Sequence, residues 1–187
     1  MNIFKLIYLC TVEKKSAVLT YRYANPEECR LVAHLTEYTF RESWTEDGNE
    51  SDVTHYVNEN FSQEVIKHEL KGSSIIYLLA FNEEVAVGYI KLERNLQPEG
   101  HQYVKPFSIS RVYVMKSFQG NQIGSRLLQQ AIEIATKENF EMIWLGVWNE
   151  NYRALHLYER FGFERFGTYQ FIMGKAISND YLMMKKL

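Results

Sequence analysis

The sequence has few of the residues that mark several other classes of protein. Its two cysteines, Cys10 and Cys29, lie far apart without CxxC spacing, so we expect reduced thiols in a cytoplasmic protein rather than a disulfide framework. Its five histidines form no HxxxH or HExxH pair, which argues against a metal cofactor. Lys and Arg number 21 against 23 Asp and Glu, a formal net charge of -2. Without a basic cluster, the chain is not expected to bind nucleic acid.

Long apolar runs and low-complexity linkers are missing as well. The apolar start of the chain, "MNIFKLIYLC", contains Lys5 and is too short to span a bilayer, so no membrane segment is expected. We expect residues 1–18 to form an N-terminal extension, either an extra strand or a flexible segment, and residues 19–187 to form one domain. The hydrophobic share of 46% in 187 residues is typical of a globular domain with a sizeable core.

The apolar pattern predicts a single mixed α/β domain, because strand-like runs alternate with helices that have one apolar face. The strongest helix pattern begins at Ile123, and the nearly all-apolar run "MIWLGVW" is expected to be a central strand. The predicted order is strand 17–24, a helix from Pro26, one or two short helices within 41–70, a hairpin of strands 75–80 and 85–92 turning at Asn82 and Glu83, strand 107–115, helix 123–139, strand 142–148, a helix ending at Gly162, and closing strands.

A glycine-containing loop, "SFQGNQIG", separates strand 107–115 from the strongest helix. Unpaired backbone N–H groups at the start of a helix can bind an anion; alternatively, Gly120 and Gly124 only permit a tight turn and close packing. A P-loop requires a lysine directly after its last glycine, and none follows Gly124. A Rossmann loop belongs to a first βαβ unit whose next strand ends in an acidic residue, whereas here that strand ends in Trp148.

Two segments, in order, resemble the GNAT superfamily of acyl-CoA N-acyltransferases. "RVYVMKSFQGNQIGSRLLQQAIEIA" is similar to the strand, Q-x-x-G-x-G loop and helix that hold the CoA pyrophosphate there. "WLGVWNENYRALHLYERFGF" is similar to the companion motif, a strand followed by N-x-x-A-x-x-x-Y-x-x-x-G-F. "WLGVW", "FIMG" and a terminal D-x-L-M-x-K-x-L pattern resemble more narrowly the bacterial PaiA-type spermidine/spermine acetyltransferases. The resemblance covers roughly Leu19 to Leu187 and implies a mixed, mostly antiparallel central sheet flanked by helices, and an acetyl-CoA-dependent N-acetyltransferase.

The resemblance places acetyl-CoA, and no metal, on this loop and the strand before it. Pantetheine would pair with the backbone of Val112 and Val114 like an added strand, and a backbone N–H near Val114 would polarise the thioester carbonyl. One position departs from the motif: Gln122 stands where the family usually has glycine, so its side chain would crowd the pyrophosphate or alter the loop's φ and ψ. The implied cofactor-binding residues are Val112, Tyr113, Val114, Gln119, Gly120, Asn121, Gln122, Ile123, Gly124, Ser125, Asn151 and Tyr158.

Two catalytic residues are also implied. Tyr158 matches the family tyrosine that acts as general acid toward the CoA thiolate, since a phenol of pKa ~10 is protonated at neutral pH and can donate to a sulfur of pKa ~8.5. Without the motif, Tyr158 would be an ordinary half-buried aromatic. Relatives often carry a glutamate at the position of Ser110. Glu93 is therefore the candidate base, directly or through a water, its alternative being an exposed charge at a strand end.

The resemblance implies a small-molecule acceptor, a primary amine of a polyamine or a similar compound, and is compatible with a homodimer. Glu37, Glu42 and Glu46 are candidates to line a polycation site, or they form an ordinary solvated helix face. Tyr38 and Trp44 are candidates to pack methylene groups, or they belong to the core. Two other functions stay open: acetylation of a peptide or protein amine, and a non-catalytic acyl-CoA-binding or structural domain, favoured by Gln122 and Ser110.

Overall fold

The computed structural model describes residues 19–44 and 50–187. The expected N-terminal extension, with Cys10, and Glu46 lie outside the described residues. Within them, seven strands form one sheet in the order β1-β2-β3-β4-β5-β7-β6. Only β4 and β5 run parallel, and every other neighbouring pair is antiparallel. This confirms the predicted single α/β domain with a mixed, mostly antiparallel sheet.

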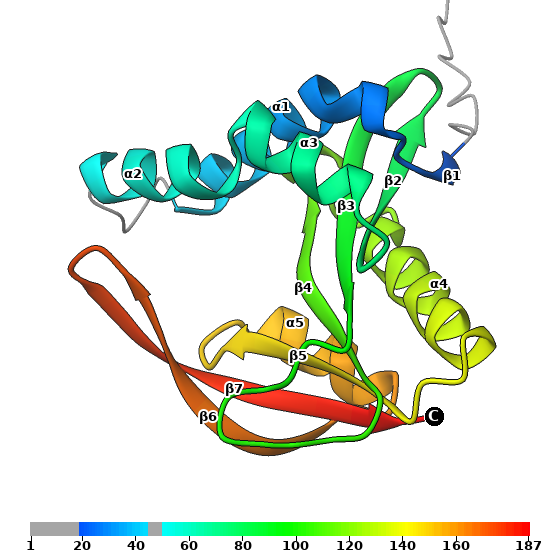
Figure 1. Cartoon of the computed structure of the whole chain (residues 1–187). Helices are drawn as coiled ribbons and strands as arrows, with labels where there is room; N and C mark the ends of the chain where they lie inside the picture. The colour runs from blue at the N-terminus through cyan, green and yellow to red at the C-terminus, as the bar shows by residue number, and fades with distance from the viewer. Residues whose placement is uncertain (1–18, 45–49) are drawn as a thin grey trace, which may run out of the picture.

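The helices and strands follow the predicted order (Figure 1). The hairpin turn lies one residue later than predicted, because Glu83 rather than Asn82 takes the positive φ of 55°. The elements are β1 Leu19–Tyr23, α1 Cys29–Trp44, α2 Glu50–Asn60, α3 Gln63–Lys71, β2 Ile75–Asn82, β3 Val85–Arg94, β4 Pro106–Val114, α4 Ile123–Lys137, β5 Met142–Trp148, α5 Tyr152–Arg160, β6 Glu164–Met173 and β7 Ala176–Lys186, with short 3-10 turns at Pro26–Glu28 and Lys116–Phe118.

Local chemistry explains where the functional helices begin and end. Asn151 caps α5, its Oδ1 accepting the Ala154 N–H at 3.1 Å. The helix then ends in a Schellman motif, with the Phe163 N–H bonded to the Tyr158 carbonyl and Gly162 at φ 82°. In α4 the buried positions Ile123, Leu127, Leu128, Ala131 and Ala135 follow the helical period and face the sheet.

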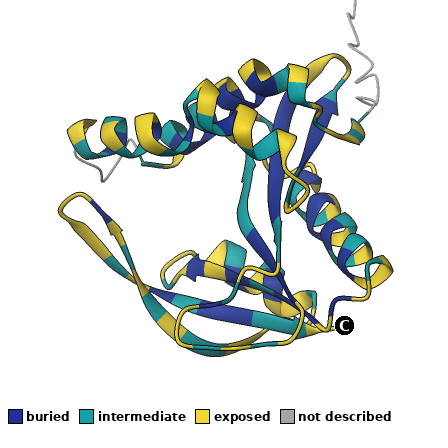
Figure 2. Ribbon diagram, in the orientation of Figure 1, coloured by how far each residue is buried: buried dark blue, intermediate teal, exposed yellow. Residues whose placement is uncertain are grey.

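Helices cover the two faces of the sheet differently. The largest buried cluster lies between the sheet and α4 and α5, and a second lies between β2 and β3 and the helices α1 and α3. A third joins Phe40 of α1, and Val53 and Val57 of α2, to Met173 of β6. Figure 1 shows a gap between the ribbons of α2 and of the β6–β7 hairpin. Side chains of this third cluster connect the two segments across it. Figure 2 shows the central strands largely buried, with the outer helix faces exposed.

The sheet opens between β4 and β5. These strands pair only along Pro106–Ile109 and Met142–Leu145, and Figure 1 shows them diverging beyond that point. At the same level Lys91 pairs with Arg111 while Leu92 pairs with Ile109, so Ser110 is an extra residue of β4. Such a bulge bends the strand and increases its twist. Within the described chain, no strand pairs with the β5-facing edge of β4 from Ser110 to Val114.

No helix in the described part of the chain has both the length and the apolar character needed to cross a membrane. Among the same residues, no group of three or more His, Cys, Asp or Glu side chains is placed to hold a metal ion.

Candidate active site

The N-terminus of α4 is suited to an anion. Its first turn contains no acidic residue, and no side chain caps it. The first backbone N–H groups of a helix lack intrahelical partners and lie at the positive end of its dipole. In the described chain, α4 therefore presents uncapped donors immediately after the loop that the motif predicts to hold a pyrophosphate.

The loop takes the conformation of a glycine loop despite Gln122. Gln122 adopts φ 60° and ψ 11°, in the left-handed region, and its side chain is exposed. Gly120 also has a positive φ, 88°, so two of the loop residues need the backbone freedom that glycine has. A Cβ placed on Gly120 or Gly124 would contact nothing within 4 Å. Packing within the described chain thus leaves the backbone open to an approaching group at these positions.

Two polar side chains hold this loop in place. The Gln119 amide donates to the Val114 carbonyl at 3.1 Å and accepts from Arg153 of α5 at 2.9 Å. The Asn121 amide donates to the Phe118 carbonyl at 3.0 Å. Because both amides are engaged within the protein, these residues would contact a phosphate chiefly through their backbone.

The open edge of β4 places its side chains on both faces of the sheet. Val112 and Val114 pack with the cluster under α4 and α5, whereas Tyr113 packs on the opposite face, with α1, α2 and β3. Residues of a strand alternate in this way, so their backbone groups lie between the faces, at the edge. The edge predicted to receive pantetheine therefore has no strand partner within the described chain, although the Gln119 amide occupies the Val114 carbonyl.

Tyr158 lies beneath this edge. It is 5% exposed, belongs to the cluster that includes Val147, and its ring centroid is 5.8 Å from that of Phe163. Burial raises the pKa of Tyr158 above its usual value, and the nearby Tyr113 hydroxyl adds to the rise. Burial, followed by the nearby Tyr56 hydroxyl, raises the pKa of Tyr113 to about 12. Both phenols are therefore protonated, and available as donors, at neutral pH.

A cavity of about 340 Å³ lies on the sheet face opposite α4 and α5. Ser108 lies between Phe107 and Ile109, and Gly146 lies between Leu145 and Val147, and these four neighbours belong to the α4-side cluster. Ile109, which precedes the bulge at Ser110, also borders the cavity. The segment that follows β3 covers it, with the Leu96 carbonyl accepting from the Trp144 indole at 2.8 Å. Its lining residues are Glu93, Leu96, Gln97, Glu99, Ser108, Ile109, Ser110, Trp144, Gly146, Tyr169 and Leu182.

Glu93 reaches this cavity but not the far end of the open edge. It pairs with Ser108, which precedes Val114 by six residues, a distance on the order of 20 Å along a strand. Proton transfer to Glu93 from an amine near Val114 would need intermediaries. The hydroxyls of Ser108 and Ser110 lie 3.4 Å apart in that direction. Glu93 is also paired with Lys91 at 3.3 Å, although Lys91 lies closer to Glu69, at 2.7 Å.

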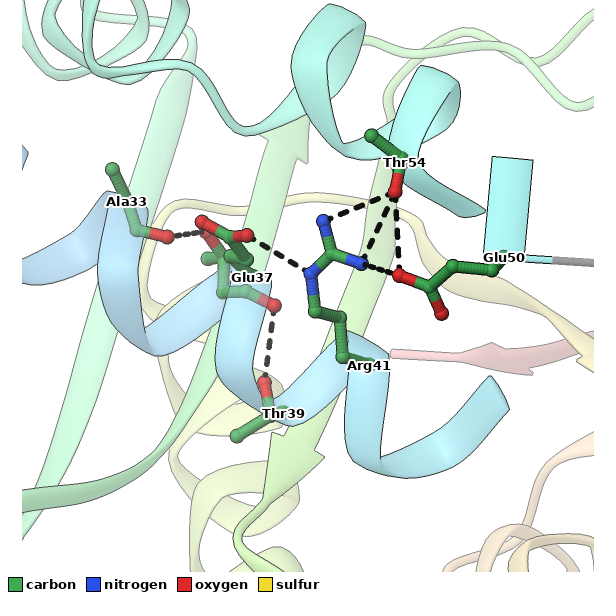
Figure 3. A network of polar contacts seen from close by, with 7 residues as sticks. Ala33, Glu37, Thr39, Arg41, Glu50 and Thr54 are labelled. Carbon is green, nitrogen blue, oxygen red and sulfur yellow. Dashed lines mark hydrogen bonds and ion pairs between the residues drawn. The ribbon is translucent and has the colours of Figure 1, made fainter. Parts of the chain in front are cut away.

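The acidic residues of α1 do not enter the cavity lining. Glu37 pairs with Arg41 at 2.9 Å, and Arg41 also reaches Glu50 and Thr54 of α2, a network seen in Figure 3. Glu42 accepts the Lys116 N–H at 2.9 Å. Tyr38 is 52% exposed, and Trp44 packs near Phe40 and Phe171. The structure therefore gives Glu37 and Glu42 roles in tying elements together and gives Trp44 a packing role.

The motifs give no role to Tyr169, Trp144 or Asp180, although Trp144 begins the "WLGVW" stretch and Asp180 is the acidic residue of the terminal D-x-L-M-x-K-x-L pattern. Tyr169 and Trp144 line the cavity, and the Tyr169 hydroxyl donates to Asp180 of β7 at 3.3 Å. The available sequence signal was a carboxylate in the middle of the last strand, "ISNDYLMM". Only the pairing of β6 with β7 shows which side chains it meets.

Fold and geometry together define an enzyme class. The open edge of β4, the uncapped N-terminus of α4 and the buried Tyr158 would suit an extended thioester carrier with an anionic end. The cavity with Glu93 and Glu99 lies on the other face of the sheet. This is the arrangement expected of an acyltransferase that uses CoA.

Comparison with known proteins agrees with this class. The family model described as Acetyltransferase (GNAT) family matches residues 30–163. An N-acetyltransferase from the pepI 3' region of Lactobacillus delbrueckii subsp. lactis is 29% identical over 156 residues, 82% of this chain and 88% of the relative. A probable spermine N(1)-acetyltransferase of Bacillus subtilis subsp. natto is 29% identical over 80 residues, 42% and 49% of the two chains. The PaiA N-acetyltransferase of Thermoplasma acidophilum, solved with coenzyme A, superposes with a TM-score of 0.74 at 21% identity, over 91% of this chain and 99% of that one.

The chain belongs to the GNAT acetyltransferase family, because the family model covers most of the domain. It is an N-acetyltransferase that depends on acetyl-CoA.

Proposed function

We propose that this protein acetylates a primary amine of a polyamine or a similar small amine. The observation that carries the proposal is the acidic cavity, which lies beside the open part of β4, on the sheet face opposite α4 and α5, and contains Glu93 and Glu99 but no Lys or Arg among its lining residues. The PaiA-like fold and the similarity to a probable spermine acetyltransferase support this acceptor class.

Binding of acetyl-CoA is assigned to the elements that fit it. The donors at the start of α4 and in the loop from Gln119 to Ser125 would hold the pyrophosphate. The backbone of Val112 and Val114 would align the pantetheine arm, and a backbone N–H near Val114 would polarise the carbonyl. Asn151, held at the start of α5 by its capping bond, would contact the cofactor from that side. When bound, acetyl-CoA supplies an acetyl group activated as a thioester.

The amine must lose a proton before it can attack. At an amine pKa of ~10, roughly one molecule in a thousand is neutral at pH 7, a penalty of ~4 kcal/mol. Glu93 would accept that proton through Ser108 and Ser110, whose hydroxyls line the same cavity. Tyr158 would donate its phenolic proton toward the departing sulfur from the opposite side of the sheet.

The test is thiol release from acetyl-CoA across a panel of amines. We expect turnover with linear polyamines and diamines. Activity confined to a peptide N-terminus or a peptide lysine would remove the small-amine acceptor and keep the enzyme class. CoA binding without transfer to any amine would favour the non-catalytic alternative.

A further inference from the structure

A carboxylate that the proposed mechanism leaves unused lies behind the cavity. Asp180 is 7% exposed and is the only Asp or Glu among the buried residues of the described chain. Its two oxygens accept hydrogen bonds from the Ser178 hydroxyl at 2.6 Å and the Tyr169 hydroxyl at 3.3 Å. No Lys, Arg or His of the described chain forms an ion pair with it.

This environment differs from that of the other inward-facing carboxylates. Glu69 binds Lys91 at 2.7 Å, and Glu138 binds Arg94 at 2.6 Å. A buried carboxylate with hydroxyl donors but no cation is under-compensated, because removing a charge from water is costly unless it is paired. Asp180 therefore lacks the cationic partner that these other carboxylates have within the described chain, and a cationic ligand would provide one.

Tyr169 connects that charge to the cavity. Tyr169 lines the cavity and covers Gly146 so closely that a Cβ there would lie 2.4 Å from the hydroxyl oxygen. Burial, followed by the Asp180 carboxylate, raises the pKa of Tyr169. The phenol thus keeps its proton on the bond to Asp180, and its oxygen lone pairs remain available to accept from an ammonium N–H.

We propose that Tyr169 and Asp180 form the subsite that binds the ammonium group of the acceptor. This inference deepens the proposed function and rests on it for the identity of the reaction. It also sets the acceptor class: an alkyl amine cation without a carboxylate beside its amines, because such a carboxylate would meet Asp180, Glu93 and Glu99 with no lining Lys or Arg to offset them. Trp144 offers an apolar wall for the alkyl chain.

The kinetic test compares two acceptors that differ by one carboxylate, 1,5-diaminopentane and lysine. We expect the wild-type enzyme to favour the diamine. Asp180→Asn should raise the KM for the diamine by about tenfold or more, which corresponds to about 1.4 kcal/mol, and should reduce the preference over lysine. A purely structural role would weaken use of both acceptors and leave the preference unchanged.

The control is Glu164→Gln, which removes an exposed carboxylate from the same sheet and should leave both KM values at the wild-type level. The CoA-induced rise in melting temperature should be equal in all three proteins, showing that the cofactor side is intact. If Asp180→Asn folds poorly, Tyr169→Phe removes only the hydroxyl and should raise the diamine KM by itself. An unchanged diamine KM in well-folded Asp180→Asn overturns the proposal.

A binding measurement separates this inference from the proposed function. Calorimetric titration of spermidine into the CoA-loaded protein needs no turnover. Binding by the wild type that is lost or at least tenfold weaker in Asp180→Asn supports the subsite, even if acetyl transfer is absent and the proposed function fails. Equal binding by both proteins, or no binding by the wild type, overturns the subsite whatever the activity.

Discussion

Replacing Gln122 by glycine tests whether the loop before α4 is built to approach a phosphate. Gln122 has φ 60° and ψ 11°, a conformation that costs an L-residue roughly 1–2 kcal/mol. Its exposed side chain makes no capping bond to α4, so no such bond is lost on substitution. Glycine also increases the conformational entropy of the unfolded chain, which lowers the free energy of unfolding by roughly 0.5–1 kcal/mol. The difference leaves a net stabilisation of about 0.5 kcal/mol, or ~1–2 °C in melting temperature for a chain of this length.

The assay is thermal unfolding with and without CoA, together with titration of CoA. Because the glycine backbone permits closer approach, we expect Gln122→Gly to bind CoA several-fold more tightly. The matched control is Gly124→Ala, since a Cβ there contacts nothing within 4 Å. Alanine favours the helix by up to about 1 kcal/mol, so this variant should be at least as stable as the wild type, and it should bind CoA more weakly.

Two results would refute this reasoning. Unchanged CoA affinity in Gln122→Gly would mean that the loop already accommodates the glutamine side chain beside the phosphates. Unchanged CoA affinity in Gly124→Ala would mean that the start of α4 is not the surface the cofactor approaches.

Three other predictions concern the catalytic residues and the buried tyrosines. Tyr158→Phe should lower kcat by about 100-fold with unchanged CoA affinity, measured by steady-state kinetics and titration; a wild-type kcat would eliminate the acid role. Glu93→Gln should lower kcat/KM by about tenfold or more at neutral pH and less at pH values near the amine pKa; an equal loss at every pH would argue against proton acceptance. Burial is the main cause of the raised pKa values of Tyr77, Tyr113 and Tyr158. Above pH ~10 the folded state therefore binds more protons than the unfolded state. The contribution of these tyrosines to the free energy of unfolding should be constant below that pH and should fall above it, by up to about 1.4 kcal/mol per pH unit for each tyrosine. A melting temperature that stays flat to about pH 11 would contradict this.

The elements of the fold were predictable because each has a strong local signal. Examples are the helical periodicity of α4, the apolar run of β5 and the glycine after α5, each of which can be recognised within its own short segment of sequence. The opening between β4 and β5 has no such signal. It depends on the bulge at Ser110 and on pairing that stops after Ile109. The apolar pattern of one strand does not show where the neighbouring strand stops pairing with it.

For the candidate site, the sequence offers a contiguous motif only on the proposed cofactor side, where it runs from β4 into α4, and the roles of those residues stay predictions. The cavity proposed for the acceptor is lined by residues of β3, β4, β5, β6 and β7, together with the segment after β3, so its residues are far apart in the chain. The sequence offered Glu37, Glu42 and Glu46 as candidates to line a polycation site, and the first two lie on α1. Their partners, Arg41 and the Lys116 N–H, became visible only in three dimensions.

The substitution at Ser110 changes where negative charge can act. The resemblance leads us to expect a glutamate at this position, and here the Glu93 side chain, across from Ser108, lines the same cavity. Lys91 pairs with both Glu69 and Glu93, so part of the Glu93 charge is already compensated. Asp180 has no such partner among the described residues. In the proposed arrangement, Glu93 on β3 would remove the proton, and Asp180 on β7, which contacts the cavity lining through Tyr169, would bind the cation.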